Sequence, residues 1–406
     1  MTSRYLPARL TGSEVYMLNI SENLALKGHD INVLTSDICC NRDLFFPFKN
    51  DLLSHNPQVV NGIGVIRFKS YPCLPFFLSE RLLNKLALRK NTVYDFIYNY
   101  CFGPITFGMH RFIVDHAKDY DLIHATAFPQ TPFYIAFKAS QKAKIPYVCT
   151  PAFHFEVPSF YNKFLIDLLR KSDAVIAATI TEKLKIVDLG VNPAKIYIVP
   201  KGVNPEEWKR ASGERFRKKY GLQDAPIVLF AGTKSEEKGV FQVLHAMKYV
   251  QNEVRGATLV TIGEETVKWK NEKSKRHIRL LDLPYVSHCD KMDAFDACAV
   301  FVMPSKVDSF GIAYLEAWIC GKPVIGARIG STPDVIRDGV DGLLVDFNDA
   351  GDLARKILFL LKDPMLRQTF GVAGRERTLK DFTWKRVAEH IDEIYTNVTA
   401  SFQYFK

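Results

Sequence analysis

The chain has 406 residues, enough for two or more domains, and its 47% hydrophobic and 24% charged residues are typical of a globular protein. No apolar run reaches the roughly 18 residues of a membrane span, and no secretory signal is visible at the N-terminus. The formal net charge is +10, but no dense basic run with interleaved aromatic residues predicts nucleic-acid binding.

Cysteine usage and the distribution of charge indicate where the protein is located and what kind of partner it binds. The eight cysteines form no Cys-x-x-Cys pair, which predicts reduced thiols, a cytoplasmic location and no zinc site. Most of the positive excess lies in residues 1–204, with 23 Lys and Arg against 16 Asp and Glu. This excess favours an anionic substrate or an anionic membrane surface as partner.

The first predicted helix runs from about Val15 to Lys27. Ser13 can cap its start and Gly28 ends it, and residues 29–35 read as a strand. Gly12 precedes the helix, and a glycine at this point lets the backbone approach a phosphate closely. The alternative is a glycine that only makes a turn.

Residues 41–120 are rich in aromatic residues and less regular. Between about Ser79 and Lys90, the basic residues Arg81, Lys85 and Arg89 recur every four positions, which predicts a helix. Such a helix can lie on an anionic membrane. It can equally have one core face and one solvated basic face, and the sequence leaves both interpretations open.

From residue 121 onward, short apolar runs alternate with helical segments, which predicts parallel sheets. Strands are expected at residues 121–124, 146–150, 173–178, 195–199, 227–231, 259–262, 284–287, 299–303, 324–326 and 342–345. Late helices are expected at about 349–362 and 384–395. His124 ends one strand and His154 follows the next, and a lone loop histidine is usually a surface or hydrogen-bonded residue.

The segment from Asp308 to Glu316 follows a strand and is expected to open a helix at about Ser309. The N–H groups at the start of such a helix are available to an anion. Glu316 would lie among apolar helix residues, where a carboxylate needs partners, and ribose hydroxyls would serve. The alternative is that Asp308 or Ser309 is only an N-cap and Glu316 only a half-exposed helix residue.

Three short motifs in this region occur in a fixed order. They are Ser309-Phe310-Gly311, Leu315-Glu316-Ala317 and Cys320-Gly321-Lys322-Pro323-Val324. In order and spacing they resemble the retaining glycosyltransferases of group 1 and family 4, although Asp308 stands where that family usually has Glu. The resemblance implies an α/β GT-B fold: two Rossmann-like domains with parallel sheets facing a cleft, and a C-terminal helix packed back on the first domain. The implied boundaries are 1–204, 205–382 and 383–406.

The resemblance also implies the site residues. Catalytic roles fall to Asp308, His154 and Lys238. Donor-binding roles fall to Gly12, Thr233, Lys234, Lys238, Ser309, Phe310, Gly311 and Glu316. Thr233 stands where the family has an arginine that holds the donor diphosphate, and a hydroxyl cannot replace a guanidinium fork. Lys234, its neighbour, is expected to substitute in part.

One expected element is missing. The family has a buried strand before the Gly12 segment, whereas residues 1–4 correspond to the end of that strand. A parallel sheet without this strand would expose two edges in its middle. Either the true start lies upstream or another segment fills the gap.

The implied activity is transfer of a sugar from a nucleotide diphosphate sugar to a glycan or lipid-linked acceptor, with retention of configuration and without a metal or other cofactor. The expected location is the cytoplasm, with a peripheral contact to an anionic membrane at its inner face. Two alternatives stay open. One is a non-catalytic sugar-nucleotide-binding or scaffold protein, motivated by Thr233, Asp308 and the missing strand. The other is a different enzyme of the same fold, such as an epimerase or a sugar phosphate synthase.

Overall fold

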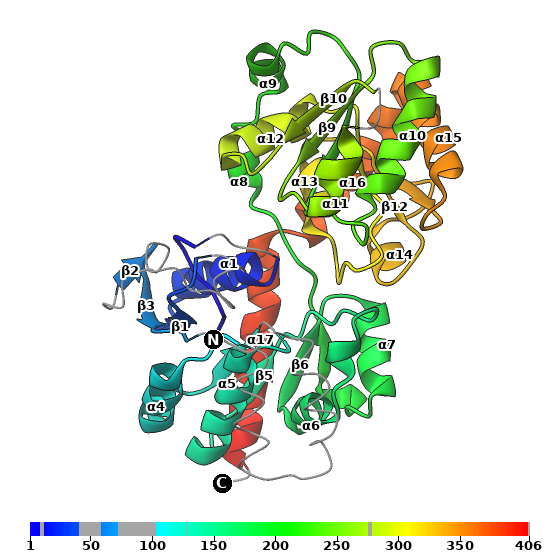
Figure 1. Ribbon diagram of the computed structural model, residues 1–406. Helices are drawn as coiled ribbons and strands as arrows, with labels where there is room; N and C mark the ends of the chain where they lie inside the picture. The colour runs from blue at the N-terminus through cyan, green and yellow to red at the C-terminus, as the bar shows by residue number, and fades with distance from the viewer. Residues whose placement is uncertain (9–11, 40–57, 72–102, 127, 275–277, 405–406) are drawn as a thin grey trace. The chain divides into compact units, whose positions relative to one another are not determined.

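The computed structural model describes residues 1–8, 12–39, 58–71, 103–126, 128–274 and 278–404 (Figure 1). The chain divides into two compact units. The first comprises Met1–Pro200 together with Val387–Lys406, and the second comprises Lys201–Arg386. The predicted basic helix at residues 79–90 lies outside the described residues.

The described residues of the first unit form two sheets. Four parallel strands form one sheet in sequence order: β4 (Ile123–Ala125), β5 (Tyr147–Cys149), β6 (Ala174–Ala177) and β7 (Ile196–Ile198). The other sheet has the order β1-β3-β2, built from β1 (Asn32–Ser36), β2 (Gln58–Val60) and β3 (Ile63–Phe68). Strands β1 and β3 are parallel, whereas β2 and β3 form an antiparallel hairpin.

The helices of this unit are α1 (Gly12–Leu26), α4 (Phe107–His116), α5 (Thr131–Ala143), α6 (Lys163–Lys171) and α7 (Ile180–Asp188), with short 3-10 turns η2 (Ala117–Asp119), η3 (Pro158–Tyr161) and η4 (Pro193–Lys195). Strands β4, β5 and β6 are buried along their whole length. Such fully buried runs are typical of parallel strands covered on both faces by helices.

The first residues of the chain lie between the two sheets. The Met1 amino group donates to the His124 carbonyl, and the Thr126 N–H donates to the Met1 carbonyl at 3.1 Å. On the other side, the Thr2 N–H donates to the Leu34 carbonyl at 3.2 Å. The Ser36 N–H donates to the Ser3 carbonyl at 3.3 Å. Residues 1–3 therefore bridge β1 and β4 at part of the predicted gap.

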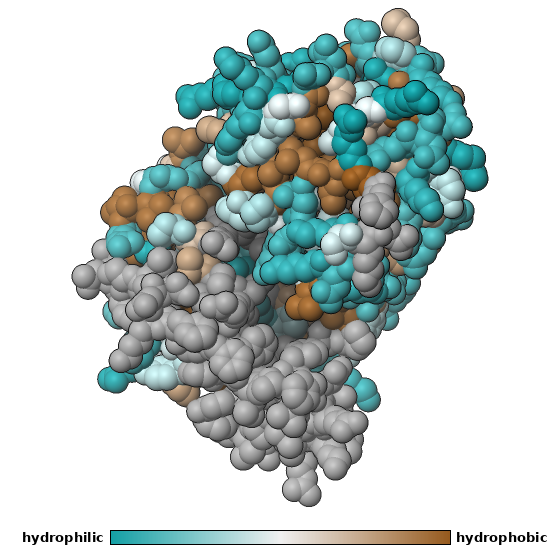
Figure 2. All heavy atoms as spheres, turned by 45° about the horizontal axis from the view of Figure 1, so that its top comes forward, coloured by the Kyte–Doolittle hydropathy of each residue, from teal (hydrophilic) through white to brown (hydrophobic). Residues whose placement is uncertain are grey.

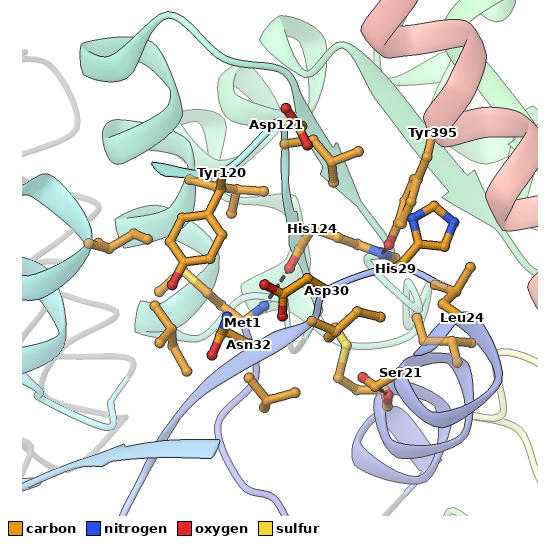
Figure 3. A pocket seen from close by; sticks show the side chains of 18 of the residues that line it. Met1, Ser21, Leu24, His29, Asp30, Asn32, Tyr120, Asp121, His124 and Tyr395 are labelled. Atoms are coloured by element: carbon orange, nitrogen blue, oxygen red, sulfur yellow. Dashed lines mark hydrogen bonds between the residues drawn. The ribbon is translucent and has the colours of Figure 1, made fainter. Parts of the chain in front are cut away.

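A cavity of about 480 Å³ lies beside Met1, between the starts of β1 and β4 (Figure 3). Its lining includes Asn32 and Leu34 of β1, His124 of β4, and Tyr395. The cavity continues the line of residues 1–3 between the two strands. Burial of the Met1 amino group in this setting lowers its pKa from 8.0 to about 5.

The second unit contains one six-stranded sheet in which every pairing is parallel, in the order β10-β9-β8-β11-β12-β13. Its strands are β8 (Ile227–Ala231), β9 (Thr258–Ile262), β10 (Leu280–Leu283), β11 (Val300–Met303), β12 (Val324–Ala327) and β13 (Gly342–Val345). The helices are α8 (Pro205–Trp208), α9 (Gly213–Tyr220), α10 (Val240–Glu253), α11 (Val267–Lys273), α12 (His288–Ala297), α13 (Ile312–Ile319), α14 (Thr332–Val335), α15 (Ala350–Lys362) and α16 (Pro364–Asp381). The predicted α/β class with parallel sheets is confirmed.

One strand prediction was wrong in its position. The strand expected at residues 284–287 lies at Leu280–Leu283 instead. Pro284 follows it at once, and Ser287 is the N-cap of α12, where its hydroxyl accepts from the Asp290 N–H at 3.1 Å. Proline has no N–H for a sheet and Ser is a preferred cap, so these residues belong to the connection.

The last helix, α17 (Trp384–Tyr404), belongs to the first unit from Val387 onward. Asp392 on this helix pairs with His29 at 2.7 Å and with Lys27 at 3.0 Å. The Tyr395 hydroxyl lies 2.6 Å from His124 Nδ1, which makes His124 part of the anchor for this helix. The predicted packing of the C-terminal helix on the first domain is confirmed (Figure 1).

Candidate active site

Two loops lie side by side at the carboxyl ends of adjacent parallel strands. Strands β8 and β11 are neighbours, and residues 232–239 and 304–311 follow them. The Lys306 N–H donates to the Glu237 carbonyl at 2.9 Å. Gly239 has φ +76°, and a Cβ added there would lie 2.3 Å from the Pro304 carbonyl oxygen, so only glycine fits. This edge of a parallel sheet is where ligands bind in open α/β folds.

The two loops bring together two predicted site residues, Lys238 and Asp308. Lys238 Nζ lies 2.6 Å from Asp308 Oδ1, and the side chains are 23% and 14% exposed. The partly buried Asp308 carboxylate restrains the Lys238 ammonium group, which stays partly exposed. An ammonium group has three N–H donors, so those not used by Asp308 can bind an anionic ligand.

Helix α13 begins at Ile312 and not at about Ser309 as predicted. Gly311 is its N-cap with φ +87°, and a Cβ there would lie 2.5 Å from the Tyr314 ring, so the close contact with Tyr314 fixes the turn. Phe310 is buried, with its ring 5.7 Å from that of Phe382. What residues 309–311 can offer a ligand is therefore their backbone N–H groups and the Ser309 hydroxyl.

Glu316 lies on α13 with a side chain that is 14% exposed. The expectation that this carboxylate needs a partner holds, and the partner in the structure is an ammonium group. Lys291 Nζ of α12 donates to Glu316 Oε1 at 2.5 Å. The sequence analysis missed Lys291 because no local motif marks it.

The role expected for Lys234 is wrong in this structure. Its side chain is fully buried, with Nζ 2.5 Å from Asp282 Oδ1 and 2.7 Å from the Leu283 carbonyl oxygen. The Lys234 N–H donates to the Glu264 carbonyl at 2.8 Å, so this residue prolongs the sheet and its side chain turns toward β10. It cannot replace the missing arginine at a diphosphate. Thr233, beside it, is exposed.

The Asp282 cluster predicts a large loss of stability for Asp282→Asn. Asp282 accepts from Lys234 and Lys273, from the Thr261 hydroxyl at 2.5 Å and from the Trp269 indole at 3.2 Å. Removing its charge leaves the Lys234 ammonium buried without a counter-charge, which costs about 3–5 kcal/mol. Urea unfolding measures the change, and Asp224→Asn, at an exposed site, is the control. Equal unfolding midpoints for the two variants would contradict this role.

The remaining predicted residues, Gly12 and His154, lie in the first unit. Gly12 is the exposed first residue of α1, and a Cβ added there meets no atom within 4 Å among the described residues. His154 is half-buried, with its ring edge-on to Phe160 at 5.2 Å. The structure thus brings Lys238 and Asp308 together, pairs Glu316 with Lys291 on neighbouring helices of the same unit, and places Gly12 and His154 in the other unit.

The described parts of the chain offer neither a metal-binding cluster nor a membrane-spanning helix. Within those parts of the chain, no group of three or more His, Cys, Asp or Glu side chains is arranged to hold a metal ion. No helix there combines the length and the hydropathy needed to cross a bilayer. On the face shown in Figure 2, hydrophilic side chains predominate among the described residues, and apolar side chains gather in smaller patches.

Two family models match almost the whole chain in succession. The model described as Glycosyltransferase Family 4 matches residues 10–207, and the model described as Glycosyl transferases group 1 matches residues 212–377. A glycogen synthase of Mycobacterium tuberculosis is 25% identical over 402 residues, which cover 96% of this chain and 92% of that protein. An alpha-maltose-1-phosphate synthase of Mycolicibacterium smegmatis is 29% identical over 266 residues, covering 61% of this chain and 68% of that protein.

Solved structures share the fold over nearly the full length. Anabaena Alr3699/HepE, in complex with UDP and glucose, matches with a TM-score of 0.71 and 16% identity, covering 98% of this chain and all of that one. Sucrose-phosphate synthase from Thermosynechococcus elongatus matches with a TM-score of 0.72 and 20% identity, covering 98% and 96% of the two chains. At these identities the likeness establishes the fold alone.

Proposed function

The chain belongs to the GT-B glycosyltransferases of group 1 and family 4, and we propose that it moves a sugar from a nucleotide diphosphate sugar to a glycan or lipid-linked acceptor with retention of configuration. The observation that carries this proposal is the Lys238–Asp308 pair beside the start of α13. Its Lys238 ammonium group places fixed N–H donors next to the backbone donors at the ligand-binding edge of a parallel sheet.

The proposed roles follow from charge and position. Lys238 and the N–H groups of residues 309–311 offset the negative charge that grows on the diphosphate as it leaves. Asp308 fixes the Lys238 ammonium and orients the donor sugar. Glu316 binds the ribose hydroxyls. Gly12 and His154 are proposed to contact the donor phosphate and the donor sugar or acceptor, respectively.

The bond changes need no protein nucleophile. The bond from the sugar C1 to the diphosphate oxygen breaks, and a bond from C1 to the acceptor oxygen forms on the same face. The acceptor proton passes to the departing phosphate oxygen. Asp308 and Glu316 are therefore not an acid pair of the kind that glycosidases use. The ammonium and backbone dipoles supply the positive charge, so we propose that transfer needs no metal ion.

Calorimetric titration of UDP, GDP and ADP tests the donor site first. We expect one of them to bind with a Kd in the range of about 1 µM to 1 mM that is typical of substrates. Transfer from the matching labelled nucleotide sugar is then assayed with and without EDTA, and NMR of the product reports the anomeric configuration. No binding of any nucleotide would contradict the proposal, while EDTA-sensitive transfer would contradict only its metal-free part.

One observation favours a second candidate, a non-catalytic sugar-nucleotide-binding protein. Exposed Thr233 stands where the family has an arginine, and the neighbouring Lys234 is buried against Asp282. The diphosphate would then have one side-chain cation fewer. Nucleotide binding without detectable transfer to any of a panel of glycan and lipid-linked acceptors would favour this candidate.

A further inference from the structure

The ammonium group of Lys291 stands directly at the carboxylate proposed to bind ribose. Lys291 lies in the first turn of α12, and Glu316 lies on α13. Their charged atoms are 2.5 Å apart, and the side chains are 30% and 14% exposed. Both side chains are therefore partly buried, and each keeps some exposed surface that a ligand can reach.

A second contact restrains the same ammonium group. Lys291 Nζ lies 6.0 Å from the centroid of the Trp208 ring, and Trp208 is buried. Trp208 is itself held edge-on by Phe295 of α12 at 5.6 Å. An ammonium between a carboxylate and an aromatic face loses much of its rotamer freedom before any ligand arrives.

The chemistry of the pair matches that of a ribose diol. A carboxylate only accepts hydrogen bonds, whereas an ammonium group has three donors and one of them goes to Glu316. Each ribose hydroxyl both donates and accepts. A hydroxyl that lies beside the pair can donate to Glu316 and accept from one of the remaining Lys291 N–H groups, so it hydrogen-bonds to both.

We infer that Lys291 is a specificity-determining residue of the nucleotide site. Together with Glu316 it binds the ribose diol. This inference rests on the function proposed above and extends it. A ligand lacking one hydroxyl leaves a partly buried ammonium or carboxylate without its partner, which is the arrangement that discriminates most strongly between substrates. The competing explanation is that Lys291 only neutralises Glu316 and positions it.

Deoxynucleotides separate the two explanations. The nucleotide diphosphate that wild type binds, and its 2′-deoxy and 3′-deoxy forms, are titrated into wild type, Lys291→Met and Lys291→Arg. We expect Lys291→Met to weaken binding of the ribonucleotide about tenfold or more and to leave the affinity for at least one deoxy form nearly unchanged. Discrimination against that form then falls by the same factor. Lys291→Arg, which keeps several donors, is expected to restore part of it.

The matched control is Lys219→Met. Lys219 also pairs with a carboxylate of α12, Asp290, at 2.6 Å, but its side chain is 51% exposed. The Lys219→Met variant should bind the ribonucleotide and both deoxy forms with unchanged affinity. Thermal melts of both methionine variants check the fold. If Lys291→Met weakens the ribo and deoxy forms equally, or neither, the inference is wrong while the proposed function stands. If wild type binds no nucleotide, the proposed function fails and this inference fails with it.

Discussion

Replacing Lys238 by methionine is expected to lower kcat for sugar transfer by about a hundredfold or more. Removing one preorganised donor from a site where negative charge develops typically costs 10²–10³ in kcat. Lys238 is the candidate for such a donor because its ammonium group is fixed 2.6 Å from Asp308 and its loop is held against Pro304 by Gly239. Single-turnover transfer from labelled donor measures the effect on the chemical step.

A neighbouring lysine provides the control for this experiment. Lys268 pairs with Glu236, two residues before Lys238, at 2.5 Å, but its side chain is 59% exposed. Exposed ion pairs contribute little, so Lys268→Met should stay within about twofold of wild type. A transfer rate for Lys238→Met close to that of Lys268→Met would contradict the role of Lys238.

The double variant Lys238→Met, Asp308→Asn separates two ways in which Lys238 can act. If Lys238 only neutralises Asp308, removing the carboxylate as well restores much of the rate. If Lys238 stabilises the leaving diphosphate, the double variant is at least as slow as the single one, because Asp308 is also proposed to orient the donor sugar. The two residues are in contact, so their effects are not expected to add.

The sequence predicted those parts of the fold that local pattern controls. Strands β8 and β11 are apolar runs of five and four residues that are followed by Gly and Pro, and the structure has them where the pattern placed them. The β2–β3 hairpin was missed although its signal was present. Asn61 and Gly62 both have positive φ, the conformation that a two-residue Asn-Gly turn favours.

Each error at the candidate site depends on a side-chain contact that residue spacing alone does not reveal. Ser309 resembles a helix cap, but the contact of Gly311 with Tyr314 sets the start of α13 three residues later. Lys234 adjoins Thr233 in sequence, yet the Lys234 side chain is buried because it pairs with Asp282, 48 residues away. No single-sequence pattern encodes which distant carboxylate an ammonium group will meet.

The partner of Glu316 shows the same limit of prediction from a single sequence. Sequence reasoning correctly held that a carboxylate among apolar helix residues needs partners. It assigned that role to ribose hydroxyls alone, whereas Lys291 of another helix already meets the carboxylate at 2.5 Å. The motif could indicate the need for a partner but not which residue supplies it.

Glu316→Ala is expected to weaken nucleotide binding and to lower kcat/KM by more than tenfold without unfolding the protein. Glu316 would contact the ribose, which does not react, so its hydrogen bonds should act similarly in the bound substrate and in the transition state. Loss of such uniform binding raises KM more than it lowers kcat, the opposite of the pattern expected for Lys238→Met. Calorimetry and initial rates measure the two quantities, with Glu376→Ala, at an exposed site, as the control. Near wild-type kcat/KM would refute the assignment, and a fall in kcat alone would place Glu316 at the reacting centre instead of the ribose.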